Sequence, residues 1–170
     1  RYSPTLLAYG ETIKVYSDMC MTTMNLAGFI NWCQEEFSKE QFNILYATTS
    51  ICFDLSVFEL FYPLSTGKPV RIIESGLHIK EILPRDERVF LNCVPSVVQN
   101  QIHQNVDFSR ISLLNMAGEP IPLSLLENLD TEHLQVRNLY GPTEDTTYST
   151  CYKLDKSKNR YIGKPIQGTY

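Results

Sequence analysis

The sequence predicts an α/β fold in which a mostly parallel sheet carries helices on both faces. Segments rich in β-branched and apolar residues alternate along the chain with segments whose apolar residues recur every three or four positions. The predicted strands are continuously apolar, which is typical of parallel strands buried on both sides. The length of 170 residues, with 43% hydrophobic and 20% charged residues, suits one compact domain.

The first part of the chain contains a lead-in, a helix and a strand. Residues 1–22 have no clear period, so we expect a lead-in of uncertain structure with at most one short strand. Apolar residues at helical spacing predict a helix over about 24–37, and the apolar stretch 42–47 predicts a buried strand. The core of the domain is therefore expected to occupy residues 23–170.

The rest of the chain continues the alternation. A second helix is expected to begin at Ser56-Val57-Phe58-Glu59, which has the pattern of a capping box, and to end at Gly67 and Pro69. Further elements are strands at 70–73, 89–94, 111–116 and 134–139, a helix from Pro95 to about His103, and a helix that opens at Pro122 and carries Leu123, Leu126 and Leu129. Residues 145–154 are rich in strand formers and predict an added antiparallel strand or hairpin arm.

Charge and hydropathy argue against nucleic-acid and membrane partners. The 15 Lys and Arg residues are outnumbered by 19 Asp and Glu, and no basic block is present that could neutralise phosphates along a polymer. No apolar run approaches the ~20 residues that cross a bilayer, and the N-terminus lacks the apolar centre of a signal peptide. We therefore expect a cytoplasmic protein. Because the first residue is Arg1 and not Met, we also expect a segment cut from a longer protein.

The cysteines and histidines do not form a recognisable reactive site. The 5 cysteines form an odd set with no CxxC pair and no histidine at metal-ligand spacing. We expect reduced, mostly buried thiols. The histidines stand apart from any Ser or Cys nucleophile, so none is expected to be catalytic; they are His78, His103 and His133.

Unusual residues follow the predicted strands, at the edge where parallel sheets bind ligands. The relevant loops contain residues 52–56, 92–96, 115–120 and 138–144. Asp54 lies between apolar residues at the start of a predicted helix. Such a carboxylate is either an N-cap or the anionic partner of a ligand's ammonium group, and local sequence leaves both interpretations open.

Four short motifs resemble those of a known family. Asn138-Leu139-Tyr140-Gly141-Pro142-Thr143-Glu144 resembles the NxYGPTE signature of adenylate-forming enzymes, specifically the adenylation domains of nonribosomal peptide synthetases. Phe53-Asp54-Leu55-Ser56 resembles the family's FDxS motif, Ala117-Gly118-Glu119-Pro120 its adenine loop, and Ile162-Gly163-Lys164-Pro165-Ile166 its IGxPI segment. The motifs occur in the family's order. The resemblance implies that residues 23–170 are a partial AMP-binding core, a subdomain of the large N-terminal part of such an enzyme.

The resemblance assigns the signature and the adenine loop to ATP or AMP. Tyr140 would lie against the adenine ring, because a flat aromatic face can stack on a base. Thr143 would contact the α-phosphate and Glu144 would hold Mg²⁺, and these two residues are the implied catalytic pair. The nucleotide-binding set implied is Gly118, Glu119, Pro120, Asn138, Tyr140, Gly141 and Thr143.

The resemblance also implies an amino-acid pocket. Asp54 would bind the substrate's α-ammonium group. The positions that would line the rest of the pocket are Leu55, Phe58, Asn92, Asn115, Ala117, Leu139, Thr147 and Tyr148. Several of these side chains are bulky, which leaves volume for a small substrate side chain. The combination resembles linings associated with alanine, with glycine or serine ranked behind it.

The implied reaction joins an amino acid to ATP, giving an aminoacyl-adenylate and pyrophosphate, and then loads the phosphopantetheine thiol of a peptidyl carrier domain in the same synthetase. The family's glycine-rich phosphate loop should precede Met21, but residues 7–18 do not match it, and the family's catalytic Lys is absent. The chain alone is therefore expected to be inactive. Three interpretations follow: part of an active adenylating enzyme, a degenerate domain kept as a scaffold, or another acyl-adenylate ligase.

Overall fold

A seven-stranded sheet organises the protein, with strand order β10-β9-β8-β7-β6-β4-β5. The computed structural model describes residues 7–9, 12–14, 20–142, 145–155 and 161–167. The strands are β4 (Ile44–Ala47), β5 (Val70–Ile72), β6 (Val89–Cys93), β7 (Ile111–Met116), β8 (Gln135–Tyr140), β9 (Thr150–Lys153) and β10 (Lys164–Pro165). The five strands from β5 to β8 run parallel, and β9 and β10 add antiparallel pairs. The mostly parallel sheet and its antiparallel arm are confirmed.

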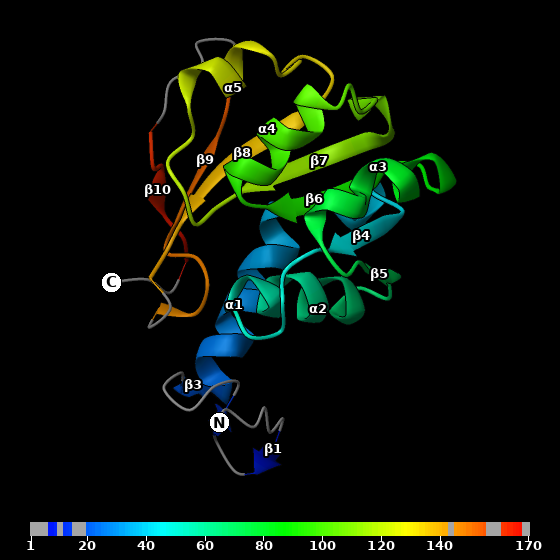
Figure 1. Ribbon diagram of the computed structural model, residues 1–170. Helices are drawn as coiled ribbons and strands as arrows, with labels where there is room; N and C mark the ends of the chain where they lie inside the picture. The colour runs from blue at the N-terminus through cyan, green and yellow to red at the C-terminus, as the bar shows by residue number, and fades with distance from the viewer. Residues whose placement is uncertain (1–6, 10–11, 15–19, 143–144, 156–160, 168–170) are drawn as a thin grey trace.

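Helices cover both faces of this sheet, as predicted (Figure 1). The helices are α1 (Thr23–Glu36), α2 (Leu55–Ser65), α3 (Ile79–Ile82), α4 (Pro95–His103) and α5 (Leu123–Glu127), with 3₁₀ turns η1 (Lys39–Gln41), η2 (Gly76–His78), η3 (Leu83–Arg85) and η4 (Phe108–Arg110). One core layer joins α3, α4 and α5 to the sheet through aliphatic side chains, among them Val98 and Leu126. The opposite layer joins α1 and α2 to the sheet and is largely aromatic, with Phe37, Phe58 and Phe90 at its centre.

The lead-in contains more structure than expected. The strands β1 (Leu7–Tyr9), β2 (Thr12–Lys14) and β3 (Cys20–Thr22) form a three-stranded antiparallel sheet. It lies at the end of α1 that is remote from the main sheet (Figure 1). The expectation of at most one short strand is therefore wrong. Strands of three residues are too short for an alternating pattern to show in the sequence.

The start of α2 also differs from the prediction. The helix begins at Leu55 with Asp54 at the N-cap position, and the Asp54 side chain makes no capping hydrogen bond. Ser56 lies inside the helix and is buried, so Ser56 and Glu59 do not form a capping box. Glu59 instead points into the protein and accepts hydrogen bonds from Thr49. The capping-box pattern was misleading because the helix begins one residue before Ser56. Ser56 and Glu59 then both lie on buried positions of the helix.

Two smaller predictions need adjustment. The helix after Pro122 ends at Glu127, so Leu129 follows it as a buried turn residue. Cys33 and Cys93 are buried, Cys151 is half-buried and Cys52 is exposed, and these four cysteines are reduced thiols. Among the described residues, no helix is both long and apolar enough to cross a membrane.

Candidate functional site

The loops after β4, β6, β7 and β8 meet at one edge of the sheet and surround two adjoining cavities. The first, which we call the Asp54 cavity, has a volume of ≈ 420 Å³. Its walls come from the loop after β4, the start of α2, the ends of β6 and β7, and the turn after β8. Its lining residues are Thr48, Thr49, Ser50, Phe53, Asp54, Leu55, Cys93, Val94, Val97, Ala117, Gly118, Glu119, Gly141 and Thr147.

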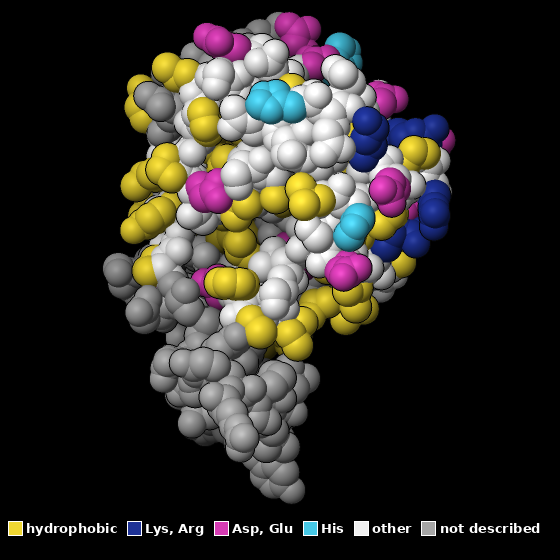
Figure 2. Space-filling model, viewed as in Figure 1, with side chains coloured by type: hydrophobic (Ala, Val, Ile, Leu, Met, Phe, Trp, Pro, Cys, Tyr) yellow, Lys and Arg dark blue, Asp and Glu magenta, His cyan; other side chains and the backbone are white. Residues whose placement is uncertain are grey.

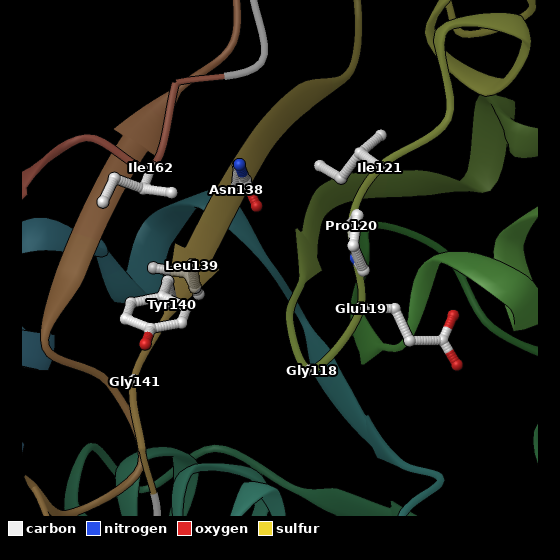
Figure 3. Close-up of a pocket in the computed structure, with 9 residues that line it drawn as sticks. All are labelled: Gly118, Glu119, Pro120, Ile121, Asn138, Leu139, Tyr140, Gly141 and Ile162. Carbon is white, nitrogen blue, oxygen red and sulfur yellow. The ribbon is translucent and has the colours of Figure 1, made fainter.

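The second cavity, which we call the Tyr140 cavity, has a volume of ≈ 480 Å³. The end of β8 forms one wall and the loop after β7 forms the facing wall (Figure 3). Its lining residues are Gly118, Glu119, Pro120, Ile121, Asn138, Leu139, Tyr140, Gly141 and Ile162. In Figure 2 a hollow lined by hydrophobic side chains is visible on the face shown, while Lys and Arg side chains gather toward the α3 end.

The two cavities share part of their lining. Gly118, Glu119 and Gly141 border both of them. The sheet therefore brings Asp54 and Tyr140 to neighbouring hollows at one edge, although the two residues are far apart in the sequence. A ligand with an ammonium group at one end and an aromatic ring at the other could occupy both hollows at once.

Asp54 combines partial burial with a carboxylate that has no ion-pair partner among the described residues. The Thr147 hydroxyl donates a hydrogen bond to the backbone carbonyl of Asp54 at 3.0 Å, which ties the signature region to the start of α2. A half-buried, unpaired carboxylate is suited to bind a cation, because pairing compensates the cost of its desolvation.

The turn that carries Thr147 has unusual backbone angles. Thr146 and Thr147 have φ values of 57° and 74°, in the left-handed region that β-branched residues rarely adopt. Both residues are buried. Gly141 packs against the same turn: a Cβ at this position would lie 2.7 Å from the Thr147 carbonyl oxygen and from the Ser149 nitrogen. The close backbone approach therefore requires glycine.

The predicted substrate residues divide into residues that line the Asp54 cavity and a buried group, here called the base, that does not line this cavity. Leu55, Ala117 and Thr147 line the Asp54 cavity together with Asp54 itself. The remaining predicted positions are fully or nearly buried, and these are Phe58, Asn92, Asn115, Leu139 and Tyr148. Of this buried group, Leu139 also borders the Tyr140 cavity.

A buried hydrogen-bond chain runs through the base. The Tyr148 hydroxyl donates to Asn92 Oδ1 at 2.7 Å, and Asn92 Nδ2 donates to Glu59 Oε1 at 3.1 Å. Thr49 donates to the same carboxylate from its backbone N–H at 3.0 Å and from its hydroxyl at 2.7 Å. Burial raises the pKa of Glu59 to about 7, although the hydrogen bonds from Thr49 and Asn92 oppose this shift.

Sequence reasoning did not assign Glu59 or Thr49 to the site. The available signal was an acidic residue on an otherwise apolar helix face, between Phe58 and Tyr62. A carboxylate at such a position must find buried donors, because an unpaired buried charge is strongly unfavourable. The capping-box interpretation hid this signal.

Asn115 adds a second amide to the base. It lies opposite Asn92 in the pairing of β6 with β7. Its side chain is buried, and neither its Oδ1 nor its Nδ2 has a hydrogen-bond partner within the described part of the chain. Buried amides are nearly always hydrogen-bonded, so this one is suited to meet a water molecule or a polar group of a ligand.

The Tyr140 cavity presents flat and apolar surfaces. Tyr140 is the last residue of β8 and is 54% exposed, and it lies across the cavity from the loop that carries Gly118 and Pro120 (Figure 3). Ile121 and Ile162 add aliphatic walls. These surfaces fit the flat, weakly polar rings of a purine. Gly118 has a φ of +83°, which lets the loop turn at this point without strain.

The Glu119 side chain is directed away from Tyr140 (Figure 3). It accepts hydrogen bonds from Ser96 at the start of α4, so the loop presents its backbone to the Tyr140 cavity.

Thr143 and Glu144, the predicted contacts of the α-phosphate and Mg²⁺, lie outside the described residues. Among the residues that the structure describes, no group of three His, Cys, Asp or Glu side chains could hold a metal ion. The described lining of the two cavities contains neither Lys nor Arg.

Comparison with known proteins identifies the family. The profile of the AMP-binding enzymes, described as "AMP-binding enzyme", matches residues 19–170. The chain belongs to this family. Among its relatives, a linear gramicidin synthase from Brevibacillus parabrevis is 39% identical over 149 residues, and AMB antimetabolite synthetase AmbB from Pseudomonas aeruginosa is 38% identical over 148. These matches cover 85% and 83% of this AMP-binding chain but only 3% and 12% of the two relatives.

Solved structures agree with this family fold. A nonribosomal peptide synthetase, FmoA3 with AMPPNP bound, matches 87% of the chain and 18% of its own length, with a TM-score of 0.76 and 26% identity. A four-domain nonribosomal peptide synthetase bound to AMP and glycine matches 94% of the chain and 13% of its own length. Its TM-score is 0.81 at 22% identity, which supports the fold.

Proposed function

We propose that this AMP-binding chain forms the amino-acid and adenine pockets of an adenylation domain in a nonribosomal peptide synthetase. The observation that carries the proposal is the junction of the Asp54 and Tyr140 cavities at Gly118 and Gly141. An α-ammonium group bound by Asp54 and an adenine stacked on Tyr140 belong to the two ends of an aminoacyl-adenylate. The similarity to two peptide synthetases over most of the chain supports the same activity.

The reaction begins when the carboxylate of the amino acid attacks the α-phosphorus of ATP. A bond forms between the carboxylate oxygen and phosphorus, and pyrophosphate leaves with the electrons of the broken P–O bond. This step needs in-line positioning and neutralisation of negative charge, and no protein nucleophile. Thr143 and Glu144 are proposed to contact the α-phosphate and Mg²⁺. The aminoacyl group then passes to the phosphopantetheine thiol of a peptidyl carrier domain.

The proposed substrate is a small amino acid, with alanine ahead of glycine and serine. The bulky residues at the base support this choice. Tyr148 packs against Phe58, Phe29 and Trp32, with ring centroids 5.6, 5.8 and 6.5 Å away. A larger substrate side chain would have to displace this aromatic packing, and close-packed cores resist added methylene groups.

Amino-acid-dependent pyrophosphate exchange tests the activity. The complete protein chain is assayed with alanine, glycine, serine and pyruvate, which has the size of alanine but carries a keto group in place of the ammonium. We expect exchange to be fastest with alanine and absent with pyruvate. Exchange with pyruvate alone would favour another acyl-adenylate ligase, whereas Asp54 supports an ammonium-bearing substrate.

A scaffold is the second candidate function, and residues 7–18 favour it. This stretch contains Gly10 but no run of glycines and hydroxyl residues that could wrap the β- and γ-phosphates. A degenerate domain of this kind would bind a non-hydrolysable alanyl-adenylate analogue without catalysing exchange. Titration of that analogue beside the exchange assay therefore separates the two candidates, and on either of them we propose that the 170 residues alone are inactive.

A further inference from the structure

Glu59 is a buried carboxylate that the proposed reaction does not use. It is 0% exposed and lies on α2, one helical turn after Leu55 at the wall of the Asp54 cavity. Its oxygens accept hydrogen bonds from Thr49 and Asn92, which belong to two different strand ends. No Lys or Arg forms a salt bridge with it in the described part of the chain. Such a group is costly to bury and calls for a specific explanation.

Glu59 connects a residue that lines the Asp54 cavity to the buried base group. Thr49 lines the Asp54 cavity and donates to Glu59 twice. Asn92 belongs to the buried base group, and it donates to Glu59 from Nδ2 while its Oδ1 accepts from Tyr148. Glu59 therefore accepts hydrogen bonds from a residue that lines the cavity and from the buried amide that holds the Tyr148 hydroxyl.

The chemistry of the carboxylate fixes the orientation of Asn92. The Oε1 atom of Glu59 accepts hydrogen bonds from both Thr49 and Asn92, so the Nδ2 side of the amide must face it. The Oδ1 side is then turned to the Tyr148 hydroxyl, which must donate its proton there. If position 59 presents an NH₂ group to Asn92, the amide can turn over so that its Nδ2 faces the Tyr148 hydroxyl, and the direction of that hydrogen bond reverses.

We propose that Glu59 is a positioning residue that holds Asn92 and Tyr148 in place and so limits the amino-acid pocket to small side chains. This inference rests on the proposed function. A longer substrate side chain would have to push past the cavity lining into the buried base group and break hydrogen bonds in the chain from Glu59 to Tyr148. The energetic cost of leaving those groups unpaired excludes the larger substrate.

The test compares two substitutions on the same helix, in the complete protein chain. Glu59→Gln keeps the shape of the side chain but places an NH₂ group among its donors. Tyr62→Phe is the matched control: it removes a buried hydrogen bond of 2.7 Å to the Phe37 carbonyl, away from the pocket. The readout is the ratio of dissociation constants for non-hydrolysable alanyl- and leucyl-adenylate analogues, with thermal unfolding recorded for every variant.

We expect the unsubstituted protein to prefer the alanyl analogue. Glu59→Gln should lower this preference by about tenfold or more, the scale on which pockets discriminate side-chain size. Tyr62→Phe should lower the unfolding temperature and leave the preference within about twofold. If Glu59→Gln lowers the unfolding temperature and leaves the preference unchanged, the residue has only a structural role and the inference is overturned.

A double variant that exchanges the carboxylate at position 59 and the amide at position 92 tests whether the preference for alanine can be restored. When Glu59→Gln is combined with Asn92→Asp, the new aspartate accepts hydrogen bonds from both the introduced amide and the Tyr148 hydroxyl, which restores the original direction of the Tyr148 bond. We expect this double variant to recover the preference for alanine to within about threefold. Failure to recover it in a folded double variant would overturn the inference. If the unsubstituted protein binds neither analogue, the proposed function itself fails, and the inference falls with it.

Discussion

The carboxylate of Glu119 accepts two hydrogen bonds from Ser96, one from the backbone N–H at 3.0 Å and one from the hydroxyl at 2.9 Å. Ser96 lies in the first turn of α4, where unpaired N–H groups favour a negative charge. Glu119 therefore anchors the loop that faces Tyr140 to the start of this helix. In the proposed nucleotide site, the Glu119 side chain would act by holding the loop backbone in position.

Glu119→Ala should weaken binding of the alanyl-adenylate analogue by about three- to tenfold, because exposed hydrogen bonds to a charged group contribute modestly. Titration calorimetry measures the change. Ser96→Ala removes only the hydroxyl donor and should have a smaller effect. The double variant should bind no more weakly than Glu119→Ala, since both substitutions remove the same contact. Additive losses would contradict the anchoring role.

Tyr140 should contribute stacking and little stability. Its ring is 54% exposed, so truncation leaves no large cavity in the core. Tyr140→Ala should weaken binding of AMP or the adenylate analogue by about tenfold or more, whereas Tyr140→Phe keeps the aromatic face and most of the affinity. Fluorescence or calorimetric titration measures both variants. Equal losses in the two variants would show that the hydroxyl, and not the ring, carries the contact.

Asp54 should be needed for ligand binding and not for the fold. Its side chain makes no capping hydrogen bond, so Asp54→Asn should leave the unfolding temperature nearly unchanged. Removing one partner of a desolvated charge pair costs about 3–5 kcal/mol, which corresponds to a loss of affinity of at least about 100-fold. AMP, which lacks the ammonium group, is the control ligand and should bind the variant normally. A similar loss for AMP would refute the assigned role.

The elements of the main sheet could be predicted from the sequence because their signals are local. The apolar run 111–116 and the proline at position 95 give β7 and α4 their observed bounds. The loops at the carboxyl ends of the strands could also be located, since parallel strands place those ends together. These rules account for the meeting of Asp54 and Tyr140 at one edge.

The hydrogen bonds of the buried base could not be predicted in the same way. The bond from Asn92 to Glu59 joins residues 33 positions apart, and the bond from Tyr148 to Asn92 joins residues 56 apart. No local pattern encodes either one. The left-handed backbone at Thr147 is likewise invisible in the sequence, because β-branched residues rarely adopt it. Both features depend on tertiary packing around α2.

Glu59 should make the stability of the protein depend on pH. Burial raises its pKa from the ordinary value of 4.5 to about 7, so the folded state holds a proton that the unfolded state releases. Below about pH 4.5 both states are protonated, and the stability that this proton contributes is fully present. As the pH rises from there to about 7, the unfolded state binds fewer protons than the folded state, and the free energy of unfolding falls. Above about pH 7 both states are ionised and the loss is complete.

Urea unfolding at about pH 5, 6, 7 and 8 measures this effect, with Glu59→Gln as the comparison because glutamine does not titrate. The difference in the free energy of unfolding between the two proteins should shift by roughly 2–3 kcal/mol over this range, in the direction that disfavours the unsubstituted protein at high pH. The hydrogen bond to Asp130 raises the pKa of His133, a second group whose ionisation changes with pH. It is present in both proteins, so its contribution cancels in the difference. A difference that stays constant with pH would mean that Glu59 is ionised throughout, held so by the donors of Thr49 and Asn92.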